Sequence, residues 1–145
     1  MEHGVITHAI NIYRTSTAVP LIIHIPGVGS KKINDLVQGI DIYPTIADLV
    51  GIHVNSYIEG IDLTGLIKGE KNAIKNKYVL SEFNGIFSVQ SANMRFYYNS
   101  PSANNGLKYS NELYDLSKDP EEKNNIALSR PEKVEEFFKL LKLIK

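Results

Sequence analysis

The stretch ELYDLSKDPEEKNNIA, residues 112–127, decides how the C-terminal half of this chain folds. Its first five residues, Glu112–Leu116, have the apolar and aromatic composition that is typical of a β-strand. The next six, from Ser117 to Glu122, contain an Asp-Pro pair and predict a turn that opens a helix. We therefore expect the chain to leave a strand here and to continue in helical structure.

A stronger helix is predicted from Arg130 to the end of the chain. Pro131 suits the first turn, and acidic residues precede basic ones along the segment, as the helix dipole favours. Apolar residues recur at helical spacing and form one stripe, made of Val134, Phe137, Phe138, Leu141 and Ile144 with Leu140 beside them. We expect this helix to close over a sheet.

The segment before residue 112 supplies the rest of that sheet. Strand-like runs cover residues 78–83, 87–99 and 112–116. Their short connections favour antiparallel pairing. An aromatic cluster in this region could stack a sugar ring or a base, but it is more typical of a sheet packed on one face and wet on the other. Its members are Phe96, Tyr97, Tyr98, Tyr109 and Tyr114.

A short helix is predicted over residues 41–51, with Asp41 capping its first amides and Gly51 ending it. Its apolar face consists of Ile42, Ile46, Leu49 and Val50. Residues 63–67 predict one further helical turn. Asp41 and Asp48 could be a pair of catalytic carboxylates, although capping and a solvated helix face account for both.

The apolar run VPLIIHI, residues 19–25, predicts a strand buried on both faces, because it is rich in β-branched residues and lacks alternation. A brief edge strand is expected near residues 33–37. The chain has too few helices to cover a doubly buried strand, so we expect it to belong to a larger parent sheet. Residues 1–18 are predicted to form a loop.

Composition excludes several functions. The 145 residues carry 16 basic and 16 acidic side chains and no cysteine. A balanced charge gives no long-range attraction for nucleic acid. The absence of cysteine removes disulfides, thiolate metal sites and a cysteine nucleophile. No apolar run approaches the length of about 20 residues that spans a bilayer.

Three stretches in fixed order resemble the sulfatase family of the alkaline-phosphatase superfamily. The first is Glu2-His3-Gly4 followed by His8, Tyr13 and the Val19-Pro20-Leu21-Ile22 run, and it ends at Pro26-Gly27. The second is the segment at residues 37–52, which contains the Asp-Ile-Tyr-Pro-Thr sequence, and the third is the segment at residues 112–127. The resemblance implies an α/β fold, namely the C-terminal portion of an alkaline-phosphatase-like sulfatase fold that ends in a small antiparallel sheet packed by a C-terminal helix. It places residues 1–75 in the catalytic α/β domain and residues 76–145 in the small C-terminal subdomain.

The resemblance also implies a function, the hydrolysis of sulfate esters with a formylglycine nucleophile and a calcium-type divalent cation. By its position after the Glu-His-Gly turn, His8 is the catalytic and substrate-binding candidate that contacts the sulfate. An imidazole suits this task because negative charge grows on the sulfate oxygens as the ester bond breaks. His3 and His8 could form a two-histidine metal site, but their spacing is unspecific.

The departures from the family pattern matter as well. No Cys-x-Pro-x-Arg or Ser-x-Pro-x-Arg motif and no paired N-terminal aspartates occur in the chain. We therefore expect the isolated chain to bind no cofactor and to be inactive, and we expect its partners to be a missing N-terminal catalytic portion and a sulfate-ester substrate. The uncovered β-branched strand edge would also favour self-association.

Two alternatives stay open at this point. One is another enzyme of the superfamily, such as a phosphodiesterase, phosphonate hydrolase or phosphoglycerol transferase. The other is a non-catalytic interaction module that keeps only the fold. Among the remaining polar residues, Glu82 and Arg95 are expected at the surface, and His24 is expected to be a strand residue with local hydrogen bonds.

Overall fold

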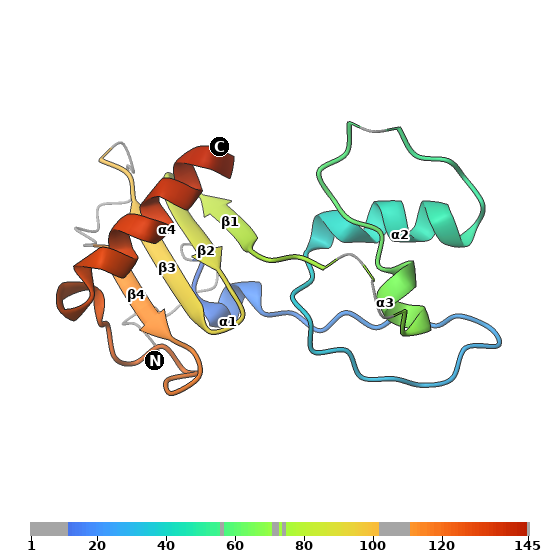
Figure 1. Cartoon of the computed structure of the whole chain (residues 1–145), viewed down its shortest axis with the longest axis horizontal. Coiled ribbons are helices and arrows are strands. Elements are labelled where there is room, and N and C mark those ends of the chain that lie inside the picture. Colours follow the sequence, from blue (N-terminus) through green and yellow to red (C-terminus); the bar gives the residue numbers. More distant parts are fainter. Residues whose placement is uncertain (1–11, 56, 71–72, 74, 102–110, 145) are drawn as a thin grey trace. The chain divides into compact units, whose positions relative to one another are not determined.

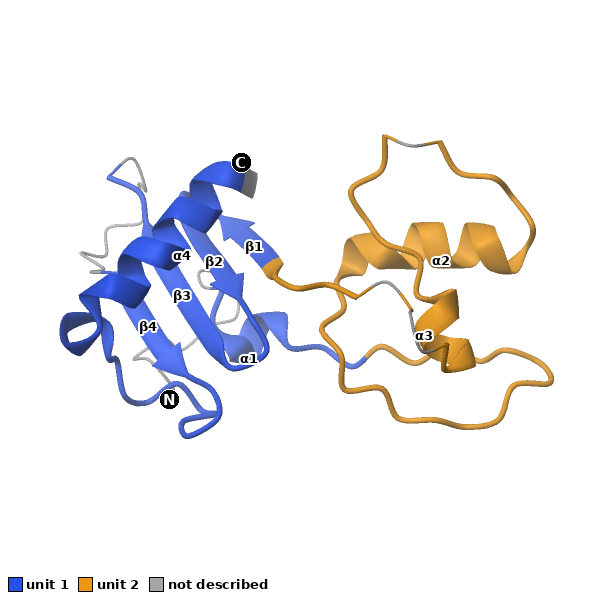
Figure 2. Cartoon of the chain, viewed as in Figure 1, with its two compact units in different colours: residues 1–20, 80–145 blue, residues 21–79 orange. Residues whose placement is uncertain are grey.

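The computed structural model describes residues 12–144 apart from residues 56, 71, 72, 74 and 102–110 (Figure 1). The chain forms two compact units (Figure 2). Residues 1–20 and 80–145 make up the first, which we call the sheet unit, and residues 21–79 make up the second, which we call the helix unit. Ile12 and Tyr13 thus pack with the C-terminal sheet, although they precede the helix unit in the sequence.

The sheet unit is built on four strands in the order β1-β2-β3-β4. The strands are β1 (Val79–Phe83), β2 (Ile86–Gln90), β3 (Met94–Asn99) and β4 (Glu112–Asp115). The predicted run over residues 87–99 is therefore two strands, because Ser91 closes a turn by donating its backbone amide to the Met94 carbonyl at 2.8 Å. A second turn joins β1 to β2, where Asn84 and Gly85 have φ of 48° and 78° as a tight hairpin turn requires.

One face of the sheet is covered by α4 (Pro131–Ile144), which confirms the predicted C-terminal helix (Figure 1). Strand residues alternate between faces, so Phe96 and Tyr98 of β3 point to the same side. The rings of Phe96 and Phe137 lie 6.2 Å apart, and those of Tyr98 and Phe138 lie 4.9 Å apart. Phe96 is fully buried as a result.

The opposite face is covered as well, so the expectation of a wet face is wrong. A second apolar cluster lies there and includes the N-terminal segment; its members are Ile12, Tyr13, Ile86, Tyr97 and Tyr114. The segment continues into the single turn of α1 (Arg14–Thr17). The sequence did not predict that this face is covered, because the strands carry aromatic residues on both faces and so show no alternation of polar and apolar residues.

The connection from β4 to α4 is mostly irregular. The turn predicted after residue 116 is present, with the backbone amide of Asp119 donating to the Asp115 carbonyl at 2.8 Å. The helix expected to open there is reduced to one 3-10 turn, η3 (Ala127–Ser129). Asp119 accounts for this, because its carboxylate accepts the amides of Lys123 and Asn124 that a helix would use.

The helix unit contains a 3-10 turn, η2 (Gly39–Asp41), followed by α2 (Ile42–Leu49) and α3 (Thr64–Lys68). Both predicted helices are therefore present, and Gly51 ends α2 with a φ of 73°. The predicted face of α2 is wrong. Its small residues Pro44, Thr45 and Ala47 are buried, whereas Ile42, Ile46 and Val50 are exposed.

Residues 19–25 form no strand and are largely exposed, so the prediction of a doubly buried strand is wrong. The edge strand expected near residues 33–37 is absent too. A strand requires a hydrogen-bonded neighbour, and among the described residues only β1 to β4 form a sheet. The run keeps its strand-like composition, and Ile22 is 89 % exposed.

Candidate functional site

The sheet unit buries a charged cluster on the face opposite α4. Arg95 donates from Nη1 to Glu122 Oε1 at 2.8 Å, and the Tyr97 hydroxyl donates to Glu122 Oε2 at 2.8 Å. Arg95 also donates to Gln90 Oε1 and, at 3.2 Å, to the Tyr97 hydroxyl. The side chains of Arg95 and Glu122 are only 7 % and 1 % exposed. This is a buried ion pair, not the surface position expected for Arg95.

Local structure explains why these groups meet. Arg95 and Tyr97 are two residues apart on β3 and therefore share one face of the sheet. Glu122 comes from the irregular connection after β4, where its backbone adopts a φ of 56°. A non-glycine residue at positive φ is strained, and the surrounding contacts have to hold it there. Both carboxylate oxygens of Glu122 accept hydrogen bonds, so this group anchors its neighbours and is poorly suited to transfer a proton.

The N-terminal segment is attached to the same cluster. The Tyr13 hydroxyl donates to Glu112 Oε1 at 2.9 Å, and the Tyr114 hydroxyl donates to the other oxygen of Glu112 at 2.6 Å. The rings of Tyr13 and Tyr97 lie 5.0 Å apart. The backbone amide of Arg14 reaches Glu122 Oε2 at 3.3 Å. Ring packing and hydrogen bonds thus fix the peptide that links Tyr13 to Arg14.

Burial is the main cause that raises the pKa of both Tyr97 and Tyr114 far above the ordinary value of about 10. For Tyr114, the hydrogen bond to Glu112 raises the pKa further. The folded state holds these protons more tightly than the unfolded chain does. The stability they contribute is therefore complete below about pH 10 and is lost as the pH rises above it.

We expect the melting temperature of the chain to fall above about pH 10, and to fall less steeply in Tyr97→Phe, which has one buried hydroxyl fewer. Thermal unfolding followed by circular dichroism across the alkaline range measures this. Tyr98→Phe keeps both buried hydroxyls and should decline as the wild type does. Equal slopes for the wild type and Tyr97→Phe would contradict the prediction.

The helix unit contains a separate polar cluster around Asp41. This carboxylate is fully buried and accepts the backbone amides of Gln38 at 2.8 Å and Ile61 at 2.9 Å. It also accepts the Asn76 side-chain amide at 2.6 Å. Gly60 lets the two segments approach, because a Cβ there would lie 2.0 Å from the Ile40 carbonyl oxygen. Asp41 therefore joins three segments and does not cap the first amides of α2, as the sequence had suggested.

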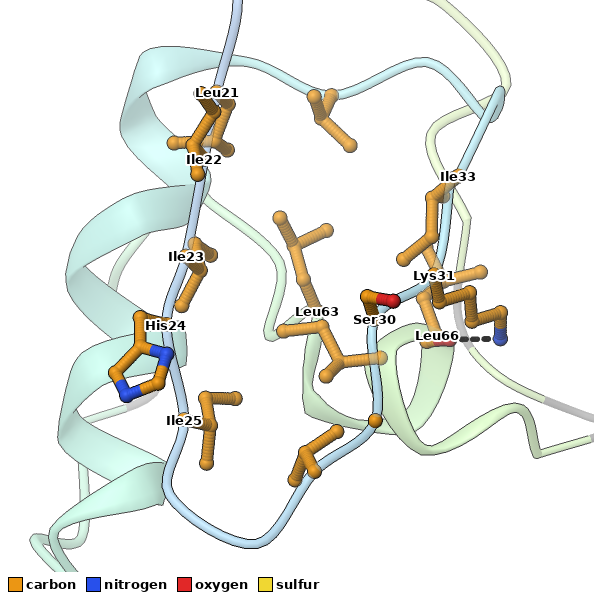
Figure 3. Close-up of a pocket in the computed structure, with 14 residues that line it drawn as sticks. Leu21, Ile22, Ile23, His24, Ile25, Ser30, Lys31, Ile33, Leu63 and Leu66 are labelled. Carbon is orange, nitrogen blue, oxygen red and sulfur yellow. Dashed lines mark hydrogen bonds between the residues drawn. The ribbon is translucent and has the colours of Figure 1, made fainter.

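A cavity of about 420 Å³ lies within the helix unit (Figure 3). The segments around residues 21–25 and 28–37 form much of its wall, and Leu63 and Leu66 project into it from α3 and the residue before it. The lining is mainly aliphatic, with Lys31 donating its ammonium to the Leu66 carbonyl at 2.9 Å. Because most of the lining side chains are aliphatic, the cavity offers few polar groups to an ionic substrate.

The structure separates the remaining predicted site residues. His3 and His8 lie outside the described residues. His24 is exposed and lies on the wall of the cavity, not on a strand. Asp41 is buried and Asp48 is exposed, so they do not form a pair of equivalent carboxylates, and Glu82 is exposed as predicted.

Sequence reasoning missed Glu122 and Tyr13 as the residues that hold the sheet unit together. Glu122 lies in the Asp-Pro-Glu-Glu segment that carries the resemblance. The resemblance marked this segment, but it did not indicate that Glu122 pairs with Arg95. Tyr13 lies in the first stretch that carries the resemblance, but the sequence gave no indication of its partner, because Glu112 lies 99 positions later in the chain.

Comparison with known proteins supplies the class. Residues 2–143 match the sequence model of the family described as N-sulphoglucosamine sulphohydrolase, C-terminal. Arylsulfatase K of Xenopus laevis is 30 % identical over 154 residues, which cover 99 % of this chain and 28 % of that protein. Delta 4,5-hexuronate-2-O-sulfatase of Bacteroides thetaiotaomicron is 33 % identical over 136 residues, covering 87 % of this chain and 27 % of that protein.

A solved structure agrees with these sequence matches. A 2-O GAG sulfatase superposes with a TM-score of 0.57 and 30 % identity, over 70 % of this chain and 23 % of that one. The fold is thus that of an alkaline-phosphatase-like sulfatase, in its C-terminal part. The chain belongs to the N-sulphoglucosamine sulphohydrolase C-terminal family of sulfatases. It spans only about a quarter of the length of the curated relatives it matches, 28 % and 27 % for the two above.

The described residues do not fit the metal site of such an enzyme. They contain no group of three or more histidine, aspartate or glutamate side chains that could hold a metal ion. Among the helices of the described part, none is long and apolar enough to cross a membrane.

Proposed function

We propose that this chain is the C-terminal part of an enzyme that hydrolyses sulfate esters. The observation that carries the proposal is the family match over residues 2–143, which includes all three stretches singled out in the sequence. The relatives are sulfatases, so the comparisons favour this function over the other superfamily enzymes and over a non-catalytic module. In this proposal residues 1–75 complete the catalytic α/β domain and residues 76–145 form the small C-terminal subdomain.

His8 is the residue proposed to contact the sulfate group of the substrate. A sulfate ester gains negative charge on its peripheral and leaving oxygens as the bond breaks, and a donating imidazole stabilises that charge. The described neighbours support such a role, because the chain is fixed at Tyr13, five residues after His8.

The nucleophile and the metal ion would come from polypeptide upstream of this chain. Sulfatases in general use a formylglycine and a metal ion, and we propose calcium for this one. The chain has no cysteine that could be converted to formylglycine. Its own contribution is to position His8 and to form part of the substrate rim.

Exposed aliphatic side chains of the helix unit support a catalytic portion as the partner. Ile22, Ile46 and Val50 are all exposed. Side chains of this kind are individually common on surfaces, but here they occupy one helix face and one strand-like run that the sequence predicts to be buried. We propose that the N-terminal catalytic portion covers them, and self-association of the isolated chain is the competing outcome.

The test compares the isolated chain with the full-length enzyme to which it contributes. The purified 145-residue chain should not hydrolyse an aryl sulfate, and His8→Ala should lower kcat/KM of the full-length enzyme by about 100-fold, as loss of one oxyanion donor does. His53→Ala, which changes an exposed histidine of the helix unit, is the control and should retain activity. Activity of the isolated chain, or equal activity of both variants, would contradict the proposal.

A further inference from the structure

Positive and negative charges are separated within the helix unit. Residues 21–79 contain six lysines and six acidic residues, yet four of the acidic residues fall within residues 41–62, which contain no lysine or arginine. The lysines fall instead in residues 31–32 and 68–77. Five of them are exposed and form what we call the lysine patch, namely Lys31, Lys32, Lys68, Lys75 and Lys77.

Contacts at the end of α3 bring Lys31 and Lys68 together. The Lys31 ammonium donates to the Leu66 carbonyl at 2.9 Å (Figure 3). It also lies 3.1 Å from the point that a Cβ on Gly69 would occupy. Lys68 directly precedes Gly69 and ends α3. An ammonium has three N–H donors, so the bond to Leu66 leaves two donors of Lys31 for an acceptor outside the protein.

The same two segments are also in contact further along, at Lys75. Its ammonium pairs with Asp35 at 2.7 Å, and the side-chain amide of Asn76 donates to the Leu36 carbonyl at 3.2 Å. Lys31 and Asp35 are four residues apart, which corresponds to at most about 14 Å of chain. The Debye length is about 10 Å at 0.1 M salt, so charges at this spacing act partly together on one anionic molecule.

The charge of the lysine patch is only partly offset by its own segments. Asp35 neutralises Lys75, and Glu70 is the other acidic residue of these segments, so three of the five lysine charges are left uncompensated. The neighbouring aromatic residue, Tyr78, is half-buried, and the Lys77 ammonium lies 5.8 Å from its ring centre. A covered ring is a poor platform for stacking a nucleobase, so this surface suits small anionic groups better than nucleic acid.

We propose that the lysine patch binds a sulfated carbohydrate chain through several of its sulfate groups. The inference rests on the proposed function for the choice of sulfate as the anion. Sulfate esters form on hydroxyl groups, and carbohydrates are polymers with several hydroxyl groups on each unit. A lysine ammonium is a compact charge with rotatable donors, which suits sulfate groups whose spacing varies along such a chain.

The test measures the binding of a fully sulfated octasaccharide to the 145-residue chain by isothermal titration calorimetry. The double variant Lys32→Ala/Lys68→Ala should weaken binding about 20-fold, as the loss of two lysines facing a polyanion does. Lys118→Ala/Lys139→Ala removes the same charge from exposed positions of the sheet unit and should bind as the wild type does. Equal melting temperatures check that both variants are folded.

Four results would overturn the inference. They are no binding of the sulfated octasaccharide, equal losses in the two double variants, equal affinity for the unsulfated octasaccharide, and equal affinity for single-stranded DNA of the same charge. Because binding is measured without catalysis, each of these results would leave the proposed hydrolysis intact. A full-length enzyme that hydrolyses no sulfate ester would instead overturn the proposed function, while selective binding of the sulfated octasaccharide would still support the lysine patch.

Discussion

Replacing Glu122 by alanine is expected to lower the free energy of unfolding of the sheet unit by about 3–5 kcal/mol. The substitution leaves the Arg95 guanidinium buried without its counter-charge and removes the acceptor of the Tyr97 hydroxyl. Gln90 and the Tyr97 hydroxyl still accept hydrogen bonds from Arg95, but neither carries a charge, and the buried Nε–H of Arg95 donates to no described residue. Chemical denaturation monitored by tyrosine fluorescence measures the loss.

The neighbouring residue offers a matched control for this prediction. Glu121 is exposed and pairs with Lys123 at the surface, so Glu121→Ala should leave stability almost unchanged. A double variant, Arg95→Met with Glu122→Leu, removes both charges and should recover much of what Glu122→Ala loses, since an apolar pair can replace a buried ion pair. A Glu122→Ala protein as stable as Glu121→Ala would show that the pair contributes nothing to the fold.

The sheet unit was the more predictable half of the chain. Its strands and its C-terminal helix follow from local patterns, such as the helical spacing of Phe137 and Leu141, both of which are buried. The charged cluster on the sheet face opposite α4 could not be predicted, because a charged residue such as Arg95 is expected to be exposed unless its partner is known. That partner lies 27 residues away in an irregular segment and has no periodicity that marks it.

The helix unit shows what local patterns leave undetermined. The spacing of apolar residues predicted α2, but the buried face is the one with Thr45 and Ala47, whose small size lets the segment at Leu63 approach. The Leu63 amide donates to the Thr45 hydroxyl at 2.9 Å, a contact that Ile46 could not make. Residues 19–25 have the composition of a strand. Composition alone does not make a strand, because a strand also needs a neighbouring segment with which it forms backbone hydrogen bonds. The assignment of His8 stays a prediction.

Asp41→Ala is expected to destabilise the helix unit by about 3 kcal/mol or more. The carboxylate is fully buried and accepts two backbone amides and one side-chain amide, all within 2.9 Å. Alanine removes the acceptor of these three partly buried donors, and a buried donor without a partner costs about 1–3 kcal/mol. Amide hydrogen exchange at Ile61 and Gln38, together with thermal unfolding, measures the effect.

Asp48→Ala serves as the control, because Asp48 lies on the exposed side of the same helix and should change stability by less than about 0.5 kcal/mol. The two aspartates then differ in the property that the sequence could not reveal, namely which of them accepts the amide of a residue 20 positions away. If Asp41→Ala speeds exchange at Ile61 no more than Asp48→Ala does, Asp41 does not join these segments. In that case the approach allowed by Gly60 must be stabilised by backbone packing alone.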